Sequence, residues 1–521
     1  MFGLLCTIVF GGAARAVVVD PSDPAILYTG RWDASNASEP WAQAKASSVI
    51  ARFEGTSIGV ALDTGSQEYY RIIIDEDAVS SSKTTLSSAS IVTLASGLPD
   101  AVHQIEIVKE TDQGRWTLLG FEIDDGKSLA PPPARPNRRL VFYGDSNLAG
   151  YSLESERNQG NTNLLGSYYT YAGITARMFD AEHHNISKSG ATISSLNSSF
   201  DRIDWGSNNP SWNFSGFPAD AVVVNIGAND YFRPKSTNIG RYHDLLDDLR
   251  SAHPNAHIML YNAYGWDIGE PANYIHEVIA DRADSNMSFA VFPWVFEQYH
   301  GCETDHAGMA QVLAAHLTSV MGWTAGASDV VSGFGLDGNV ANGGFETRAP
   351  FGGWGWRYFD DAGVSRIHDP AGAIEGEHYL RLSDGASTQQ TNPAGDGDVI
   401  DLAMWLRGAV DGAQVDVTID FRDQAAGAEI ADPMQSETQT MTLNSVWQRY
   451  SMTATAPSGA SKPVYSMRVT FAAGSGDSLD IDGVAVGQPT PIPIAAWVTG
   501  SLGGLLGALG ARRLRRRFDR P

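Results

Sequence analysis

The pattern of apolar and polar residues along the chain changes period twice. Between residues 17 and 130, short runs such as Ser57–Leu62 and Tyr70–Asp75 alternate apolar and polar side chains between turn residues, which predicts an antiparallel β-sandwich. Between 139 and 325, apolar runs alternate with helical stretches, which predicts a three-layer α/β/α unit on a parallel sheet. From 338 to 488 the β pattern returns. The predicted fold class is therefore multidomain: a β-sandwich, an α/β/α unit, then a second β-sandwich.

The middle region is specific enough to predict individual elements. Strands are expected where four to eight apolar residues follow one another, and helices where the apolar residues recur with a helical period. The expected strands cover 139–143, 221–226, 257–262 and 288–295, and the expected helices lie near 167–180, 238–251, 271–283 and 305–321.

Two segments of unusual composition flank these regions. Met1–Ala16 is apolar and ends in an A-x-A-like cleavage site, which predicts a signal peptide, with a buried first strand as the alternative. Near the other end, a proline-rich stretch precedes an uncharged apolar run just long enough to span a bilayer, and an arginine cluster follows. The expected divisions are 1–16 (signal peptide), 17–130 (sandwich), 131–326 (α/β/α domain, beginning with a stiff proline-rich linker), 327–488 (second sandwich) and 489–521 (tail).

Composition argues against several functions. The 521-residue chain carries a formal net charge of −24, which argues against nucleic acid as a partner. Of the two cysteines, Cys6 lies in the expected signal peptide, so Cys302 is left alone and an intramolecular disulfide is excluded in the mature chain. The histidines show no paired spacing that would indicate a metal site.

The most informative polar residue follows a strand of the middle region. The apolar run Leu140–Tyr143 breaks into Gly144–Asn147, so Ser146 is expected at the carboxyl end of a parallel strand, where open α/β sheets place their active sites. A serine at that place is a candidate nucleophile. The Gly-Asp-Ser tripeptide recurs at 476–478, where its surroundings predict a β-turn and no histidine follows it.

Three further blocks follow Ser146 in order. A short apolar stretch ends in a turn at Gly190, a second strand ends in Gly-x-Asn-Asp at Asn229, and a helical stretch begins at His306. Together these blocks resemble the SGNH (GDSL-like) hydrolase superfamily. The resemblance implies that Ser146 is the nucleophile with His306 as its base, and that the amides of Ser146 and Gly190 with the Asn229 side chain form an oxyanion hole.

The sequence leaves three arrangements possible for the acid of the triad. The superfamily commonly carries an acid three residues before the histidine, and here that residue is Glu303. Asp305 directly precedes His306 and is the alternative, and a dyad whose imidazole is oriented by a main-chain carbonyl is a third arrangement. The other histidines, His300 and His316 among them, are expected to be surface or core residues without a catalytic role.

The first two regions carry a second resemblance. Tyr28–Asp33, Ile50–Ser57 and Leu118–Asp124 resemble the N-terminal domain of carbohydrate esterase family 2, in which a jelly-roll domain precedes an SGNH domain. Gly301-Cys302 also fits the family, although the spacing from Cys302 to His306 is one residue longer here. The resemblance implies removal of acetyl groups from polysaccharides such as xylan, by acyl-enzyme chemistry that needs no metal or organic cofactor.

The last region resembles carbohydrate-binding modules of the β-sandwich type, through Asn342–Glu346 near its start and Ile481–Val484 near its end. Exposed tryptophans in such modules stack on sugar rings, so the resemblance implies glycan binding. The alternative for each tryptophan is a place in the sandwich core. The candidates are Trp354, Trp356 and Trp447.

The tail resembles the PEP-CTERM-type sorting tails of Gram-negative bacteria, with Pro491–Trp497 as the matching stretch. It implies export and a sorting machinery, and a permanent membrane anchor is the alternative. The sequence as a whole predicts a secreted or cell-envelope serine esterase that removes O-acetyl groups from polysaccharides. The alternatives are a broad-specificity esterase or lipase of the same superfamily and a non-catalytic glycan-binding surface protein.

Overall fold

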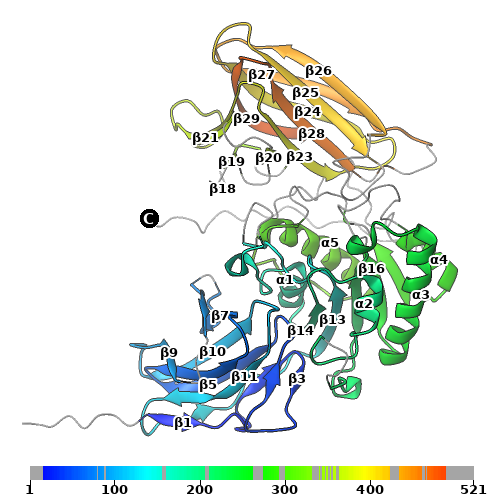
Figure 1. Ribbon diagram of the computed structural model, residues 1–521. Coiled ribbons are helices and arrows are strands. Elements are labelled where there is room, and N and C mark those ends of the chain that lie inside the picture. The colour runs from blue at the N-terminus through cyan, green and yellow to red at the C-terminus, as the bar shows by residue number, and fades with distance from the viewer. Residues whose placement is uncertain are drawn as a thin grey trace, which may run out of the picture.

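Three folded regions follow one another along the chain (Figure 1). The computed structural model describes residues 16–487, apart from 79, 87–89, 155–159, 206–209, 262–273, 291, 293–299, 331–339, 341–342, 346–347, 350–351, 354–355, 359–362, 423–432, 460–463 and 465. In the part of the chain so described, no helix is long and apolar enough to cross a membrane. The expected signal peptide, except for Ala16, and the sorting tail from residue 488 onward lie outside the described residues, so both stay predictions.

The first region is a sandwich of two antiparallel sheets, as predicted. One sheet has the order β3-β4-β11-β6-β9 with β1 beside β11, and the other has the order β12-β5-β10-β7-β8 with β2 beside β5. Alternating apolar side chains turn inward from both sheets, and Phe53, Tyr70 and Trp116 are fully buried between them. The strands are β1 (Val17–Val19), β2 (Leu27–Thr29), β3 (Trp32–Asp33), β4 (Trp41–Ala42), β5 (Ser48–Gly55), β6 (Ile58–Thr64), β7 (Tyr69–Ile74), β8 (Ser82–Thr85), β9 (Val92–Ala95), β10 (Ala101–Lys109), β11 (Trp116–Ile123) and β12 (Leu129–Ala130).

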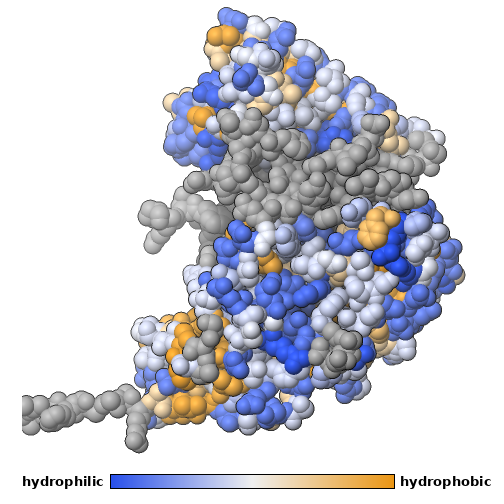
Figure 2. Space-filling model, viewed as in Figure 1, coloured by the Kyte–Doolittle hydropathy of each residue, from blue (hydrophilic) through white to orange (hydrophobic). Residues whose placement is uncertain are grey.

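Apolar surface on the face drawn in Figure 2 gathers over this sandwich. Val18 and Ile91, on or beside the edge strands of its first sheet, are 65% and 37% exposed. The middle region shows a predominantly hydrophilic surface on the same face. On this side of the molecule, exposed apolar area is therefore more extensive on the sandwich than on the middle region.

The second region is the predicted α/β/α unit. Its sheet has the order β14-β13-β15-β16-β17, and every neighbouring pair is parallel. Four of the strands and four of the helices lie within a few residues of their predicted ranges, because buried apolar runs are a strong sequence signal of a parallel sheet. Strand β14 and helix α2 were not predicted. The strands are β13 (Arg138–Gly144), β14 (Ala181–Ser187), β15 (Ala221–Asn225), β16 (His257–Tyr261) and β17 (Met287–Ala290). The helices are α1 (Tyr171–Met178), α2 (Ile193–Asn197), α3 (Lys235–Ala252), α4 (Ile275–Arg282) and α5 (Glu303–Met321), with short 3₁₀ turns η1 (Thr162–Leu164), η2 (Phe214–Gly216) and η3 (Ala228–Asp230).

Helices cover both faces of this sheet. Leu140 and Phe142 of β13 pack into one core with α1 and α5, and Val141 and Tyr143 pack into a second core with α3 and α4. The chain leaves β13 for β14 on one side and then crosses to β15 on the other. The strand order therefore reverses at β13, and the loops that follow β13 and β15 flank the crevice where such sheets bind ligands.

The third region is the predicted second sandwich. Its sheets have the orders β20-β23-β28-β25-β26 and β21-β22-β29-β24-β27, and a large core lies between them. The second Gly-Asp-Ser copy occupies the turn between β28 and β29, where the Asp477 amide donates to the Gly474 carbonyl at 3.0 Å. The strands are β18 (Arg348–Ala349), β19 (Gly352–Gly353), β20 (Arg357–Tyr358), β21 (Val364–His368), β22 (His378–Ser383), β23 (Ser387–Pro393), β24 (Val399–Gly408), β25 (Gln414–Arg422), β26 (Gln435–Thr442), β27 (Gln448–Thr455), β28 (Ser466–Ala473) and β29 (Ser478–Gly487).

A buried arginine joins the first sandwich to the α/β/α unit. Arg31, which follows β2, is completely buried. Its Nη1 donates to the carbonyls of Phe200 and Arg202 at 2.6 and 2.8 Å, and its Nη2 donates to the Tyr143 hydroxyl at 2.9 Å. All three acceptors belong to the second region, so this side chain holds the two regions together from the inside.

Replacement of Arg31 should therefore destabilise the protein far more than loss of a surface cation. Arg31→Met removes three hydrogen bonds from a charged donor and leaves buried acceptors unpaired, so we expect a loss of about 3 kcal/mol or more in unfolding free energy. The matched control is Lys127→Met, because Lys127 and its partner Asp100 are 31% and 61% exposed. That change should cost under about 1 kcal/mol. Urea denaturation of the full chain measures both, and similar losses would contradict the joining role of Arg31.

Candidate active site

Ser146 lies where the sequence predicts it, two residues beyond the end of β13. Gly144 pairs with Ser187 on β14 and with Asn225 on β15, so the three strands end in register and their following loops meet at one edge. A side chain at Gly144 would place its Cβ 2.7 Å from the Asn225 carbonyl oxygen, so only glycine fits between the strands there. Ser146 is 5% exposed at this edge.

His300 is the histidine at Ser146. Its Nε2 lies 2.8 Å from the Ser146 Oγ, and its ring packs on Tyr151 with the ring centroids 4.6 Å apart. Burial lowers the pKa of His300 to about 4, so the imidazole is neutral at pH 7. A neutral imidazole within hydrogen-bond reach of a serine hydroxyl is the geometry of an activated nucleophile.

His306, the base expected from the sequence, contacts Tyr171. It is in the first turn of α5, where its Nδ1 accepts the Tyr171 amide at 3.1 Å and its ring stacks on the Tyr171 ring. Burial lowers its pKa to about 3, and a backbone hydrogen bond with Gly301 opposes that shift. The His306 ring thus turns toward Tyr171 of α1, while the histidine six residues earlier reaches Ser146. The assignment of His306 as the base stays a prediction.

The two candidate acids serve other contacts. The Asp305 carboxylate accepts the Cys302 amide at 2.9 Å, which caps α5. In the described part of the chain, the Glu303 side chain makes no hydrogen bond to either histidine. Burial, and then the negative charge of Glu154, raise the pKa of Glu303 to about 7 against the opposing effect of Arg71. Glu303 thus lies near the charged side chains of Glu154 and Arg71. The sequence did not predict this environment for a triad acid.

The two remaining residues of the expected oxyanion hole lie on the loops after β14 and β15. Gly190 has φ +80° and is exposed, and nothing lies within 4 Å of where its Cβ would be, so this turn is open to solvent on that side. Asn229 on η3 donates through Nδ2 to the Ala191 carbonyl at 2.9 Å, and Asp230 accepts the Ile193 amide at 2.9 Å. These two hydrogen bonds join the loops, so Gly190 and Asn229 are held together at the edge that carries Ser146.

A buried carboxyl group stands next to the nucleophile. Burial raises the pKa of Asp145 to about 7, although hydrogen bonds from the amide and side chain of Asn147 favour its charged form. The Asn147 amide donates to its Oδ1 at 3.0 Å and fixes the turn that presents Ser146.

Sequence reasoning missed one contribution from the first sandwich. Asp112, 5% exposed, lies in the connection between β10 and β11, and its Oδ2 accepts the Ser189 amide at 3.3 Å. The Lys188 ammonium donates to the Asp112 carbonyl at 3.2 Å. The residues just before Gly190 are therefore held by another domain, and no local sequence pattern marks such a contact.

The structure describes two of the three candidate glycan-binding tryptophans of the third region. Trp356 is 3% exposed and packs on Phe345 and Phe471 in the sandwich core, which is the alternative given for it above. Trp447 is half-buried, donates through Nε1 to the Gly372 carbonyl at 2.6 Å and has the Arg407 guanidinium 4.6 Å from its ring. Trp354 lies outside the described residues. Glycan binding by this region stays a prediction.

Among the described residues, no group of three or more histidine, cysteine or acidic side chains could hold a metal ion. The groups at this edge are a serine, a histidine and amide donors, which are the groups that acyl transfer uses.

Comparison with sequence families identifies both domains of this part of the chain. Residues 28–133 match the family described as carbohydrate esterase 2 N-terminal, and residues 142–317 match the GDSL-like lipase/acylhydrolase family. Among curated proteins, the chain is 29% identical over 331 residues to the cellulase/esterase CelE of Acetivibrio thermocellus, an alignment covering 58% of this chain and 40% of that protein. It is also 24% identical over 248 residues to an acetylxylan esterase/glucomannan deacetylase of Cellvibrio japonicus, covering 42% of this chain and 68% of the relative. The chain thus spans less than half the length of the first of these relatives.

Solved structures agree with this assignment. A family two carbohydrate esterase from Clostridium thermocellum in complex with cellohexaose is 27% identical, with a TM-score of 0.53 over 57% of this chain and 99% of that one. A family two carbohydrate esterase from Cellvibrio japonicus shares the fold at 20% identity, with a TM-score of 0.55 over 60% of this chain and 99% of that one. Residues 28–133 and 142–317 therefore match, in chain order, the N-terminal domain of carbohydrate esterase 2 and a GDSL-type hydrolase domain.

Proposed function

We propose that this protein is a serine esterase that removes O-acetyl groups from polysaccharides outside the cytoplasm. The observation that carries the proposal is the 2.8 Å contact between His300 and Ser146 at the switch point of a GDSL-type domain. The polysaccharide substrate is supported by the relative named an acetylxylan esterase/glucomannan deacetylase. The signal-like N-terminal segment supports the location.

The chemistry follows from the positions of the side chains. The Ser146 Oγ attacks the acetyl carbonyl carbon while the neutral His300 takes its proton through Nε2. Negative charge then develops on the carbonyl oxygen, and we expect the amides of Ser146 and Gly190 and the Asn229 side chain to bind it. The His300 imidazolium next protonates the departing sugar hydroxyl. Water, deprotonated by the same imidazole, hydrolyses the acetyl-enzyme and restores the serine.

The substrate class is tested by acetate release from a panel of acetylated polysaccharides, with acetylated xylan and glucomannan set against long-chain acyl esters. Release from the polysaccharides with little action on long acyl chains is the expected result. The reverse preference would assign the chain to the broad-specificity esterases or lipases. Failure of a fluorophosphonate to label Ser146 would instead indicate a glycan-binding protein without activity.

The nucleophile can be separated from its copy in the third region. Ser146→Ala should lower kcat for acetate release by about 10⁴-fold or more, because it removes the hydroxyl that lies 2.8 Å from the His300 imidazole and attacks the ester. Ser478→Ala is the matched control, since Ser478 begins a strand of the distant sandwich and pairs with Ser383. It should leave kcat unchanged, and equal losses in both variants would overturn the assignment of Ser146.

The two histidines give opposite expectations. His300→Ala should lower kcat by about 10⁴-fold while the melting temperature changes little. His306→Gln should leave kcat within about tenfold of the parent and act through stability, since His306 accepts a main-chain amide in the core. Steady-state kinetics together with thermal denaturation distinguish the two roles. A greater kcat loss in His306→Gln than in His300→Ala would restore the histidine expected from the sequence.

The buried base should also shift the pH dependence. Protonated His300 cannot accept the Ser146 proton, so activity is lost as pH falls through the pKa of His300. Because burial lowers that pKa to about 4, kcat/KM should hold its plateau through pH 6 and decline only near pH 4 to 5. Direct acetate detection measures this profile, with circular dichroism at each pH to confirm folding. An acidic limb near the ordinary histidine value of about 6.5 would contradict the geometry.

A further inference from the structure

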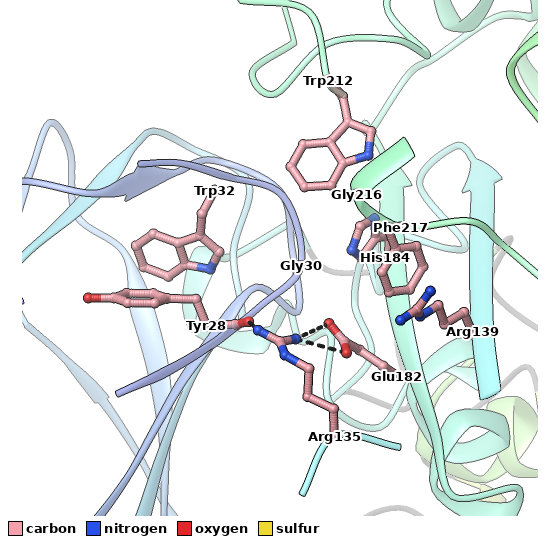
Figure 3. Close-up of a pocket in the computed structure, with 10 residues that line it drawn as sticks. All are labelled: Tyr28, Gly30, Trp32, Arg135, Arg139, Glu182, His184, Trp212, Gly216 and Phe217. Atoms are coloured by element: carbon pink, nitrogen blue, oxygen red, sulfur yellow. Dashed lines mark hydrogen bonds and ion pairs between the residues drawn. The ribbon is translucent and has the colours of Figure 1, made fainter. Parts of the chain in front are cut away.

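A cavity lies between the first sandwich and the hydrolase domain (Figure 3). Its volume is about 300 Å³, at the lower end of the range for small-molecule sites. Arg139 lines it from the start of β13, whereas Ser146 follows Gly144 at the other end of this strand, about 16 Å away at 3.3 Å per residue. The cavity is therefore separate from the candidate active site.

Aromatic rings form much of the lining. Tyr28 and Trp32 come from the sandwich, and Trp212 and Phe217 come from the hydrolase connection that precedes β15. Figure 3 shows the two sandwich rings on one side of the cavity and the two hydrolase rings on the other. Aromatic faces around an open cavity suit the apolar C–H faces of a flat ring-shaped ligand.

One side of the cavity is closed by a neutralised pair of charges. Arg135 Nη1 donates to both carboxylate oxygens of Glu182 at 2.8 and 2.9 Å, and its Nη2 donates to the Tyr28 carbonyl at 2.8 Å. Arg135 belongs to the proline-rich linker, so the linker itself fixes the sandwich against β14. The two charges of this pair neutralise each other, so neither is available to bind a charged ligand.

Arg139 is the second arginine that lines the cavity. Its main-chain amide donates to Asp220, but in the described part of the chain its guanidinium makes no ion pair, and the contact it has is with the Phe217 ring at 5.6 Å. Cations at a cavity wall are normally balanced by a carboxylate. An unbalanced guanidinium here, in a chain whose net charge is −24, indicates that the cavity accepts an anionic group.

His184 adds an unsatisfied polar atom. The side chain is 2% exposed and stacks on Phe217 with the ring centroids 3.8 Å apart, and its Nδ1 has no hydrogen-bond partner in the described residues. Burial, and next the nearby Arg31 charge, hold the pKa of His184 well below its ordinary value, so the ring is neutral. Figure 3 places the ring at the cavity among the aromatic side chains. A neutral imidazole without a partner suits a hydroxyl group, which can both donate and accept.

We propose that this cavity binds a pyranose ring that carries a carboxylate, the uronic acid residue of an acidic glycan. The aromatic rings take the C–H faces of the sugar, Arg139 binds the carboxylate and His184 bonds a ring hydroxyl. This binding site goes beyond the esterase activity and does not depend on Ser146. On a long polymer it raises the local concentration of substrate at the other edge of the sheet, because both sites can be occupied by one chain.

The test is direct binding to the full chain carrying Ser146→Ala, so that ester chemistry does not enter. Methyl β-D-glucuronide is titrated by calorimetry and by ligand-observed NMR, and methyl β-D-glucoside, which has the same ring without the carboxylate, is the comparison. We expect saturable binding of the glucuronide at least about tenfold tighter than that of the glucoside, because a charge-assisted fork to a carboxylate contributes about that much.

Variants locate the site. Arg139→Gln should remove the preference for the glucuronide while the glucoside binds as before, and Arg139→Lys, which retains the charge without the planar fork, should keep part of the preference. Arg449→Gln is the matched control, because Arg449 is exposed on β27 of the third region. Its affinity for both sugars should equal the parent's.

Three outcomes would overturn the proposal: no saturable glucuronide binding, equal affinity for the two sugars, or an affinity in folded Arg139→Gln and Arg139→Lys that equals the parent's. Melting temperatures confirm that the variants fold. A parent chain that binds glucuronide but releases no acetate would refute the esterase and leave this site standing. A chain that releases acetate but binds no glucuronide would do the reverse.

Discussion

The arrangement of the first two domains depends on a buried carboxylate that neither domain could satisfy alone. Glu110 of the sandwich is completely buried, and Arg71 Nε donates a hydrogen bond to its carboxylate at 2.6 Å. The same carboxylate accepts hydrogen bonds from the main-chain amides of Ser167 and Tyr168 in the hydrolase domain. Burial by itself would raise its pKa, but Arg71 and then Lys83 outweigh burial and hold the pKa below its ordinary value. An unpaired buried charge costs several kcal/mol. The domains therefore fit together in the one orientation that supplies these donors.

The same interface reaches the site of chemistry. The buried Lys45 ammonium of the sandwich donates to the Ala149 carbonyl, in the loop that carries Ser146, and Asp112 holds the turn before Gly190. Catalysis by oxyanion stabilisation requires donors fixed before the charge develops. The sandwich thus acts on the active site through its loops, which gives a physical reason for finding the two domains joined in one esterase family.

The candidate active site and the proposed binding cavity lie at opposite ends of the parallel sheet. The carboxyl ends of β13, β14 and β15 collect the serine, the amide donors and the Asn229 side chain, because these strands finish in register. The amino ends of β13 and β14, covered by the sandwich, leave the aromatic cavity with an unbalanced Arg139. A polysaccharide is long enough to contact both edges, whereas a small ester can use only the first.

Much of this protein followed from the sequence by itself. The period of the apolar residues predicted all three regions and four of the five strands of the parallel sheet, all but β14, and the strand-end rule brought Ser146, Gly190 and Asn229 to one edge. These features depend on neighbouring residues, whose spacing sets which face is buried and where a strand ends.

Tertiary structure decided the rest. His300 and His306 stand six residues apart at a helix start, and only the packing of α5 on α1 determines which ring turns to Ser146 and which accepts a core amide. Trp356 proved to be a core residue for a similar reason, since two sheets close over it. The contacts of Arg31 and Asp112 join domains. Such pairings depend on how distant segments meet, and local periodicity carries no information about them.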